Sequence, residues 1–269
     1  MGLRVNTNIA SLTAQRNLGS VSNRLSGNFS RLSSGLRIAT AADDAAGLAI
    51  SEKLRSQIRS FGVNARNAQD GISLVQTAEG ALNEVSNQLG RLRELAVQAA
   101  NGTLSDSDRT TLDAEYQALT TEIERISADT EFNGVALLDN TTALNIQVGL
   151  DSGDTIAVNA VDVGSVQTNL GDITTSANAN TQLALIDTEI DTINNARGAL
   201  GASQNRLQSA FASISNVREN LSAAESRIRD VDIASETADL TRNSILQQAA
   251  TSVLGQANAQ PQLALSLLG

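Results

Sequence analysis

The sequence predicts a mainly α-helical protein: a long antiparallel helical bundle or coiled coil with a small β-hairpin insertion and with both termini paired as helices. Proline occurs once among 269 residues, at Pro261, so long helices can run without interruption. Hydrophobic residues make up 41% but aromatic residues only 2%, which suits thin seams of Ala, Leu, Ile and Val between helices. Apolar residues also recur in steps of three and four over long stretches, as in paired amphipathic helices.

The first predicted helix lies near the N-terminus and has one apolar face. That face comprises Val5, Ile9, Leu12, Leu18, Val21 and Leu25. Ser33-Ser34-Gly35 interrupts the pattern. Asp43-Asp44 stands where the next helix begins, because acidic side chains favour the positive end of the helix dipole.

A heptad repeat predicts one long helix over about residues 44–100, roughly 80 Å at 1.5 Å per residue. Its apolar positions alternate in steps of four and three from Leu54 to Ala99, with one break in phase between Val75 and Ala78. Asn101-Gly102 supplies a C-cap signal. Ser105 with Asp108 then resembles a capping box and predicts a second helix over 105–129.

The centre of the chain has a different pattern. Phe132-Asn133-Gly134 is a turn signal, and the following residues alternate between apolar and polar. This alternation predicts a β-hairpin at about 134–160, with its turn between Gly149 and Gly153. Residues 162–181 are rich in Gly, Asn, Ser and Thr and are expected to form a surface loop.

A second long heptad repeat predicts a return helix over 183–231 that packs antiparallel to the first. A last amphipathic segment follows, and we expect Pro261 to end or kink it. Its apolar stripe includes Ile245, Leu246, Ala249, Val253 and Leu254. Paired only with each other, the two terminal helices bury little area, so their apolar faces are expected to contact other copies of the chain.

Residues absent from the chain exclude several kinds of chemistry. There is no His and no Cys, which excludes His general bases, Cys nucleophiles and thiolate or imidazole metal sites. We therefore expect no catalytic, cofactor-binding or metal site, and assign Asp43-Asp44 to a helix start and Asp151 and Asp154 to a turn. A net charge of −10 argues against a nucleic-acid partner. No apolar run is long enough for a membrane span or a cleaved signal peptide.

Several motifs in combination closely resemble bacterial flagellin, over roughly residues 1–160 and 180–269. The N-terminal ones are Arg31-Leu32-Ser33-Ser34-Gly35-Leu36-Arg37-Ile38, Asp43-Asp44-Ala45-Ala46-Gly47, Asn67-Ala68-Gln69-Asp70-Gly71-Ile72-Ser73 and Arg91-Leu92-Arg93-Glu94-Leu95-Ala96-Val97-Gln98. The C-terminal ones are Ile245-Leu246-Gln247-Gln248-Ala249 and Leu265-Ser266-Leu267-Leu268.

The resemblance implies a structural subunit of the flagellar filament, which polymerises into a helical tube that acts as a propeller for motility. Residues 1–41 and 234–269 would form the inner tube, residues 42–233 would form the outer core, and further outer domains would be absent. The chain would be secreted without a cleaved signal peptide. Its partners would be itself, a flagellin export chaperone, the filament cap and the hook-associated junction proteins.

The resemblance also implies two sites on the outer core. Arg91, Leu95 and Glu115 match the pattern by which some flagellins are bound by Toll-like receptor 5. The hairpin region, with Gly134, Gly149 and Gly153, corresponds to a region linked to switching between filament shapes. The alternative interpretation is a hook–filament junction protein, which shares flagellin-like termini. A coiled-coil enzyme or receptor is disfavoured by the missing His, Cys, phosphate loop and membrane span.

Overall fold

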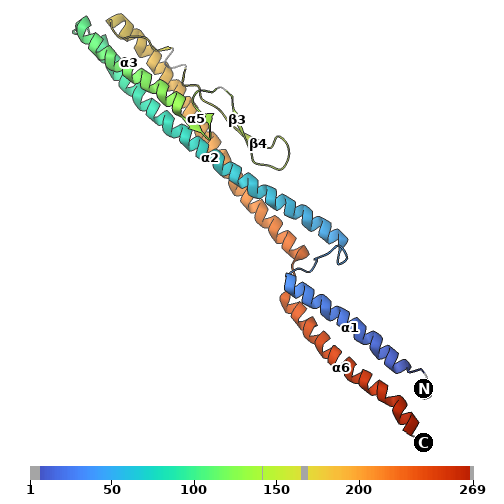
Figure 1. Cartoon of the computed structure of the whole chain (residues 1–269). Coiled ribbons are helices and arrows are strands. Elements are labelled where there is room, and N and C mark those ends of the chain that lie inside the picture. Colours follow the sequence, from blue (N-terminus) through green and yellow to red (C-terminus); the bar gives the residue numbers. More distant parts are fainter. Residues whose placement is uncertain (1–6, 141, 165–168, 267–269) are drawn as a thin grey trace. The chain divides into compact units, whose positions relative to one another are not determined.

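The computed structural model describes residues 7–140, 142–164 and 169–266 (Figure 1). The chain divides into two compact units, one formed by Met1–Ser56 with Asn220–Gly269 and the other by Gln57–Glu219. Both divisions fall inside long helices, α2 (Ala45–Ala100) and α5 (Ser176–Arg229). The expected functional division at residues 41/42 and 233/234 stays a prediction.

The first unit is built around α1 (Ile9–Ser34) and α6 (Ile233–Ser266), which lie side by side (Figure 1). Asn8 caps α1 by accepting a hydrogen bond from the backbone N–H of Ser11, and Gly35 ends the helix in the left-handed conformation at φ 71°. The two helices are antiparallel, because Asn8 near the start of α1 bonds to Ala257 near the end of α6. The predicted pairing of the termini is confirmed.

Helix α6 continues through Pro261 to Ser266, so of the two expectations for Pro261 the end of the helix is wrong and a kink stays a prediction. Proline removes one backbone donor and strains one turn, at a cost of about 3 kcal/mol, but it does not prevent the helix from continuing.

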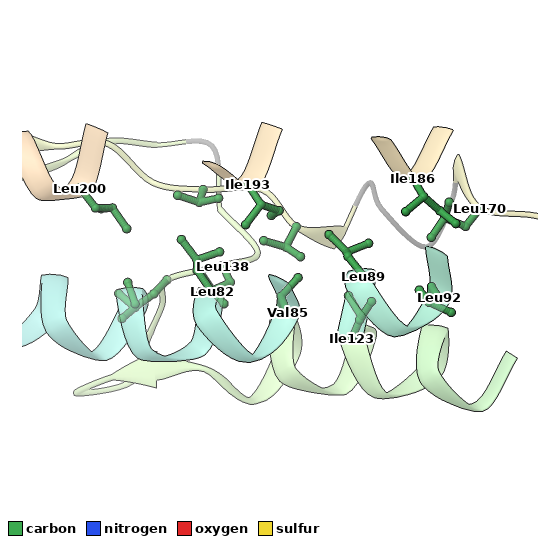
Figure 2. Close-up of a cluster of buried hydrophobic side chains, with 14 of the residues drawn as sticks. Leu82, Val85, Leu89, Leu92, Ile123, Leu138, Leu170, Ile186, Ile193 and Leu200 are labelled. Atoms are coloured by element: carbon green, nitrogen blue, oxygen red, sulfur yellow. The ribbon is translucent and has the colours of Figure 1, made fainter. Parts of the chain in front are cut away.

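The second unit is a three-helix bundle of α2, α3 (Asp106–Asp129) and α5, and it holds the main hydrophobic core. Figure 2 shows side chains of α2, including Leu82 and Leu89, directed towards Ile186 and Ile193 of α5. Leu82, Leu89 and Ile186 have no exposed surface. Val75 and Ala78, which flank the predicted break in phase, are 0% and 2% exposed, so both sides of the break belong to the seam.

The end of α2 is closed by side chains from the other two helices. The buried guanidinium of Arg109 donates from Nε to the carbonyl of Ala99 at 2.8 Å and from Nη2 to that of Asn101 at 2.9 Å. The hydroxyl of Ser176 donates to the carbonyl of Ala100 at 2.9 Å. These bonds satisfy carbonyls that would otherwise lack partners at a helix C-terminus. The capping box of Ser105 and Asp108 begins α3 as predicted.

The described β structure consists of two separate two-stranded sheets rather than one hairpin. Strands β1 (Glu131–Phe132) and β2 (Val135–Ala136) turn at Asn133-Gly134, where both residues have positive φ. Strands β3 (Leu144–Gln147) and β4 (Thr155–Val158) pair antiparallel, with Leu144 opposite Val158 and Gln147 opposite Thr155. The predicted hairpin is therefore β3–β4, and Gly134 lies in a different turn.

Residues 162–181 are not the surface loop that their composition predicts. Val163, Leu170 and Ile173 are 1%, 8% and 0% exposed and belong to the core, and α5 begins at Ser176. The polar residues hold this segment in place: the carboxylate of Asp172 accepts hydrogen bonds from Thr174 and Asn178. The polar side chains of Asp172, Thr174 and Asn178 therefore serve local hydrogen bonding, and their polarity does not indicate a loop that is free in solvent.

Candidate assembly surface

Helices α1 and α6 pack through a seam that follows a heptad spacing. On α1 it runs through Ser11, Ala14, Leu18, Val21, Leu25 and Asn28, all buried or half-buried. On α6 it runs through Glu236, Leu240, Asn243, Gln247, Ala250, Leu254 and Ala257, also buried or half-buried. The bond between Asn28 and Asn243 fixes the register and places Val21 opposite Ala250. The seam is therefore unusually polar for a coiled coil.

The larger apolar side chains of α1 and α6 lie mostly outside this seam. The exposed ones, which we call the outer apolar face, are Ile9, Leu12, Phe29, Ile233, Ile245, Leu246 and Val253. Their exposed fractions range from 42% at Leu246 to 60% at Ile9, Ile233 and Ile245. Concentrated exposure of this kind is characteristic of a surface that contacts another protein.

The structure separates the predicted assembly residues into two groups. Ile9, Leu12, Ile245, Leu246, Ala249 and Val253 are exposed, whereas Leu18, Val21, Leu25 and Leu254 are half-buried in the seam. Val5 lies outside the described residues. Phe29 and Ile233 were not predicted as assembly residues. Phe29 lies out of phase with the heptad of α1, which was an available signal, whereas Ile233 is in phase with Leu240 and Leu254 and carries no such signal.

A polar cluster at one end of the seam was also missed. The Asn243 side-chain N–H donates to the Oδ1 of Asn28 at 2.8 Å, and Asn28 in turn donates to a carboxylate oxygen of Glu236. Arg31 donates from Nε to the same oxygen at 2.8 Å. Asn28 and Asn243 are 2% and 9% exposed. We call these four residues the polar layer.

The predicted receptor-recognition residues lie on the second unit, where α2 meets α3. Arg91 forms a salt bridge with Glu115 at 2.7 Å and another with Glu94 at 2.9 Å, and all three side chains are exposed. The hydrogen bonds that Arg91 donates to Glu115, and then to Glu94, raise the pKa of Arg91. Leu95 is only 2% exposed and belongs to the core, so the structure presents Arg91 and Glu115 to solvent but not the side chain of Leu95.

The turn of the β3–β4 hairpin is fixed to α2 by two asparagine side chains. Asn64 donates to the carbonyl of Gly149 at 2.9 Å, and Asn67 donates to that of Gln147 at 3.2 Å. A Cβ at Gly149 would lie 2.3 Å from the Cβ of Asp154, so only glycine fits this turn. Gly153 also requires glycine, because its φ is +96°.

Two further findings bear on the chemistry of the described residues. They contain no group of three or more acidic side chains arranged to hold a metal ion. None of their helices is long and apolar enough to cross a membrane.

Comparison with known proteins decides the family. The bacterial flagellin N-terminal helical region matches residues 5–143, and the bacterial flagellin C-terminal helical region matches residues 183–268. The chain belongs to the bacterial flagellin family. It is 49% identical to a flagellin of Halalkalibacterium halodurans over 269 residues, which cover 98% of this chain and 99% of that relative.

The solved structures agree with the flagellin fold. The crystal structure of Bacillus cereus flagellin matches with a TM-score of 0.52 and 38% identity, covering 60% of this chain and 94% of that one. A Vibrio parahaemolyticus chain described as a flagellar hook-associated protein matches with a TM-score of 0.56, covering 70% of this chain and 98% of that one. At 16% identity the latter shows a common fold only and does not favour the junction-protein alternative.

Membership of the family settles the general function. The flagellin is a structural subunit that polymerises into the flagellar filament, an extracellular appendage, and it is not an enzyme. It is a short form without the variable outer domain, as the near-complete coverage of a relative of similar length shows.

Proposed function

We propose that the outer apolar face of α1 and α6 is the surface through which this flagellin packs against other copies in the inner tube of the filament. Residues 1–41 and 234–269 then form the inner tube, and residues 42–233 form the outer core. The exposure of Ile245, Leu246 and Val253 beside a polar seam carries this proposal. A folded chain gains about 25 cal/mol for each Å² of this surface that a neighbouring copy removes from water.

The occupant of this face is a second copy rather than another part of the same chain. The two helices already use their seam-facing residues for each other, which leaves the outer apolar face without a partner in the described part of the first unit. A groove of 570 Å³ beside this face, lined partly by Asn28, Asn243 and Leu246, offers space for a side chain of a neighbouring subunit.

Two matched substitutions on α6 test this proposal. Ile245→Asp places a charge on the outer apolar face, and we expect seeded filament growth to stop because the charge cannot be buried against a neighbour without a partner. Thr251→Asp places the same charge at an exposed polar position of the same helix, and growth should continue. Equal growth rates for the two variants, measured by light scattering and negative-stain microscopy, would argue against the outer apolar face as the contact.

We also infer that the β3–β4 hairpin contacts a neighbouring subunit and takes part in switching between filament shapes. The hairpin packs Ile156 and Val158 into the core and is bonded to α2 through Asn64 and Asn67. A small strand pair of this kind can shift between two packings with a small difference in free energy. Gly149→Val collides with Asp154 and should change the waveform or block growth. Gly102→Val, where a Cβ meets nothing within 4 Å, is the control and should leave the waveform unchanged.

Arg91 and Glu115 are proposed as the exposed part of a Toll-like receptor 5 site, with Leu95 supporting them from the core. Arg91→Ala should weaken receptor activation at least tenfold, because the guanidinium is the group that Glu115 holds in a fixed position. Arg125→Ala removes an equally exposed and paired arginine from α3 and should leave activation unchanged. A receptor that responds equally to both variants would exclude this site.

Export and assembly partners complete the proposal. We infer secretion through the flagellar export apparatus without a cleaved signal peptide, with an export chaperone on the terminal helices and with the filament cap and hook-associated junction proteins at the ends of the filament. Intact-mass analysis of protein taken from filaments should show the sequence retained from its first residues. A mass that lacks an N-terminal segment would contradict export without cleavage.

A further inference from the structure

We propose that the polar layer of Asn28, Arg31, Glu236 and Asn243 selects the register in which α1 and α6 pair. This inference rests on the proposed role of the two helices in the inner tube and adds a specificity element to it. Asn28 and Asn243 are buried, while Arg31 and Glu236 are half-buried. The layer crosses between the helices and joins groups that are 208 and 215 residues apart in sequence. These contacts form only when α1 and α6 pair, so they can distinguish one register of the pair from another.

The remainder of the seam hardly distinguishes one register from another. On α6, Ala250 and Ala257 are seven apart and equivalent, whereas Leu240 and Leu254 are fourteen apart with Gln247 between them. On α1, Leu18, Leu25 and Leu32 are seven apart and identical. A slip by one heptad therefore moves Gln247 from Leu25 to Leu18 and places Leu240 opposite Leu25, so apolar burial along this part of the seam changes little.

The polar layer changes sharply under the same slip. Asn243 would move from Asn28 to a place opposite Val21, and its buried amide would lose the hydrogen bond of 2.8 Å that it now makes. The same slip places Glu236 opposite Asn28 and leaves its carboxylate within one turn of Arg31, so the loss falls on the buried amide of Asn243. A buried polar group without a partner is costly, so the layer penalises the slipped pairing more than it stabilises the native one.

The other end of the pair carries a second set of polar contacts in the same register. Asn8 donates to the carbonyl of Ala257 at 2.7 Å, and Ser11 donates to the Oδ1 of Asn258 at 2.7 Å. Each of these contacts has a partner open to solvent, because Asn8 is half-buried and Asn258 is exposed, whereas Asn28 and Asn243 are both buried. Water can replace them after a slip, which leaves the buried layer as the stronger determinant of register.

The absence of cysteine from the chain permits a direct measurement of register. Ser11→Cys with Asn258→Cys reports the native register, because these side chains touch in the structure. Ser11→Cys with Thr251→Cys reports a slip by one heptad. Both pairs are treated with a short bis-maleimide, which adds one cysteine thiol to each of its two rings, in seeded filaments. Only the cross-linked product that contains a single chain is counted.

In chains that keep Asn28 and Asn243, we expect the pair Ser11→Cys with Asn258→Cys, the native reporter, to give a cross-linking yield at least tenfold above that of the slipped reporter, Ser11→Cys with Thr251→Cys. Asn28→Leu with Asn243→Leu should bring the two yields to within about twofold, since no buried amide then loses its partner in the slipped register. Gln247→Leu is the matched control: it adds one leucine to the seam but keeps the layer, so the tenfold preference should remain.

A relocation variant keeps the proposal testable if the double leucine variant fails to elongate. It adds Val21→Asn and Ala250→Asn to the two leucine substitutions, which moves the asparagine pair by one heptad along both helices. Elongation and the tenfold preference should both return. The proposal is overturned if the leucine variant keeps the native preference, or if relocation restores neither property.

The cross-linking and elongation results also distinguish selection of the register by the polar layer from assembly through the outer apolar face. If the native chain elongates but its native reporter does not cross-link, the α1–α6 pairing itself is wrong in the filament. If Ile245→Asp still elongates while the register results hold, the layer selects the register and the assembly surface lies elsewhere.

Discussion

The two units distribute similar amino acids in opposite ways. In the second unit, Leu82, Leu89 and Leu92 are fully buried between helices. In the first unit, the seam contains Asn28 and Asn243 while apolar residues such as Ile245 are exposed. A region that is stable by itself buries its leucines within one chain, whereas a region that is completed by assembly leaves them for its neighbours.

The sharpest way to separate the two units is to delete the chain from Leu246 onward. The deletion removes Leu246 and Val253 from the outer apolar face, together with the larger part of α6, but no residue of the second unit. We expect polymerisation to be lost completely, while the thermal unfolding midpoint of the second unit stays within a few degrees of the parent. Filaments that still grow from this truncated chain would refute the assignment of the C-terminus to the inner tube.

The core of the second unit is tested by Leu89→Asp. Leu89 is 0% exposed, so the new carboxylate must be buried without a partner, and we expect a loss of at least about 4 kcal/mol in the free energy of unfolding. Val97→Asp on the same helix, at 50% exposure, should cost less than about 1 kcal/mol. Chemical denaturation followed by circular dichroism measures both, and equal losses would mean that Leu89 is not in the core.

Arg109→Ala tests the closure of α2. The substitution leaves the carbonyls of Ala99 and Asn101 without their donors, and we expect a loss of about 2–3 kcal/mol. Arg125→Ala breaks only exposed salt bridges and should cost less than about 1 kcal/mol. If the two variants unfold at the same denaturant concentration, Arg109 does not stabilise the helix end.

The smallest effect concerns Tyr116, which is buried and whose hydroxyl has no hydrogen-bond partner among the described residues. Burial, with the nearby charge of Asp113, raises the pKa of Tyr116 above its ordinary value of about 10. The unfolded chain therefore releases this proton first, and stability falls as the pH rises above about 10. Tyr116→Phe should be within about 1 kcal/mol of the parent at neutral pH and should lose less stability at alkaline pH.

Tyr116 is the only tyrosine and the chain has no tryptophan, so its ionisation can be followed directly by ultraviolet absorbance. The absorbance of the tyrosinate should rise together with unfolding and not before it. A titration near pH 10 in the folded protein would show that Tyr116 is accessible.

The helical framework was predictable because its signals are local and repeated. The heptad repeat of α2 and the capping box at Ser105 lie within or directly before the helices that they predict. They therefore predict these helices without any knowledge of the packing partner. Residues 162–181 were mispredicted because their polar side chains mask the sparse core residues Leu170 and Ile173. The average composition of this segment does not reveal a few isolated core residues.

The assembly surface was only partly predictable, for a different physical reason. Two stripes of α6 follow helical spacing, one through Leu246 and Val253 and the other through Asn243, Gln247 and Ala250. Hydrophobicity favours the first as the partner of α1, yet the structure pairs the second with α1. Which stripe faces the intramolecular partner depends on hydrogen bonds such as that between Asn28 and Asn243, and a single sequence does not reveal these.

The central claim, that neighbouring copies cover the outer apolar face, is tested most directly by the reactivity of one thiol. Val253→Cys introduces the only cysteine of the chain, at a position that is 57% exposed in the single subunit. If neighbouring copies cover this position, a maleimide should label the thiol rapidly in the monomer and at least tenfold more slowly in the assembled filament. Equal labelling rates in monomer and filament would contradict it.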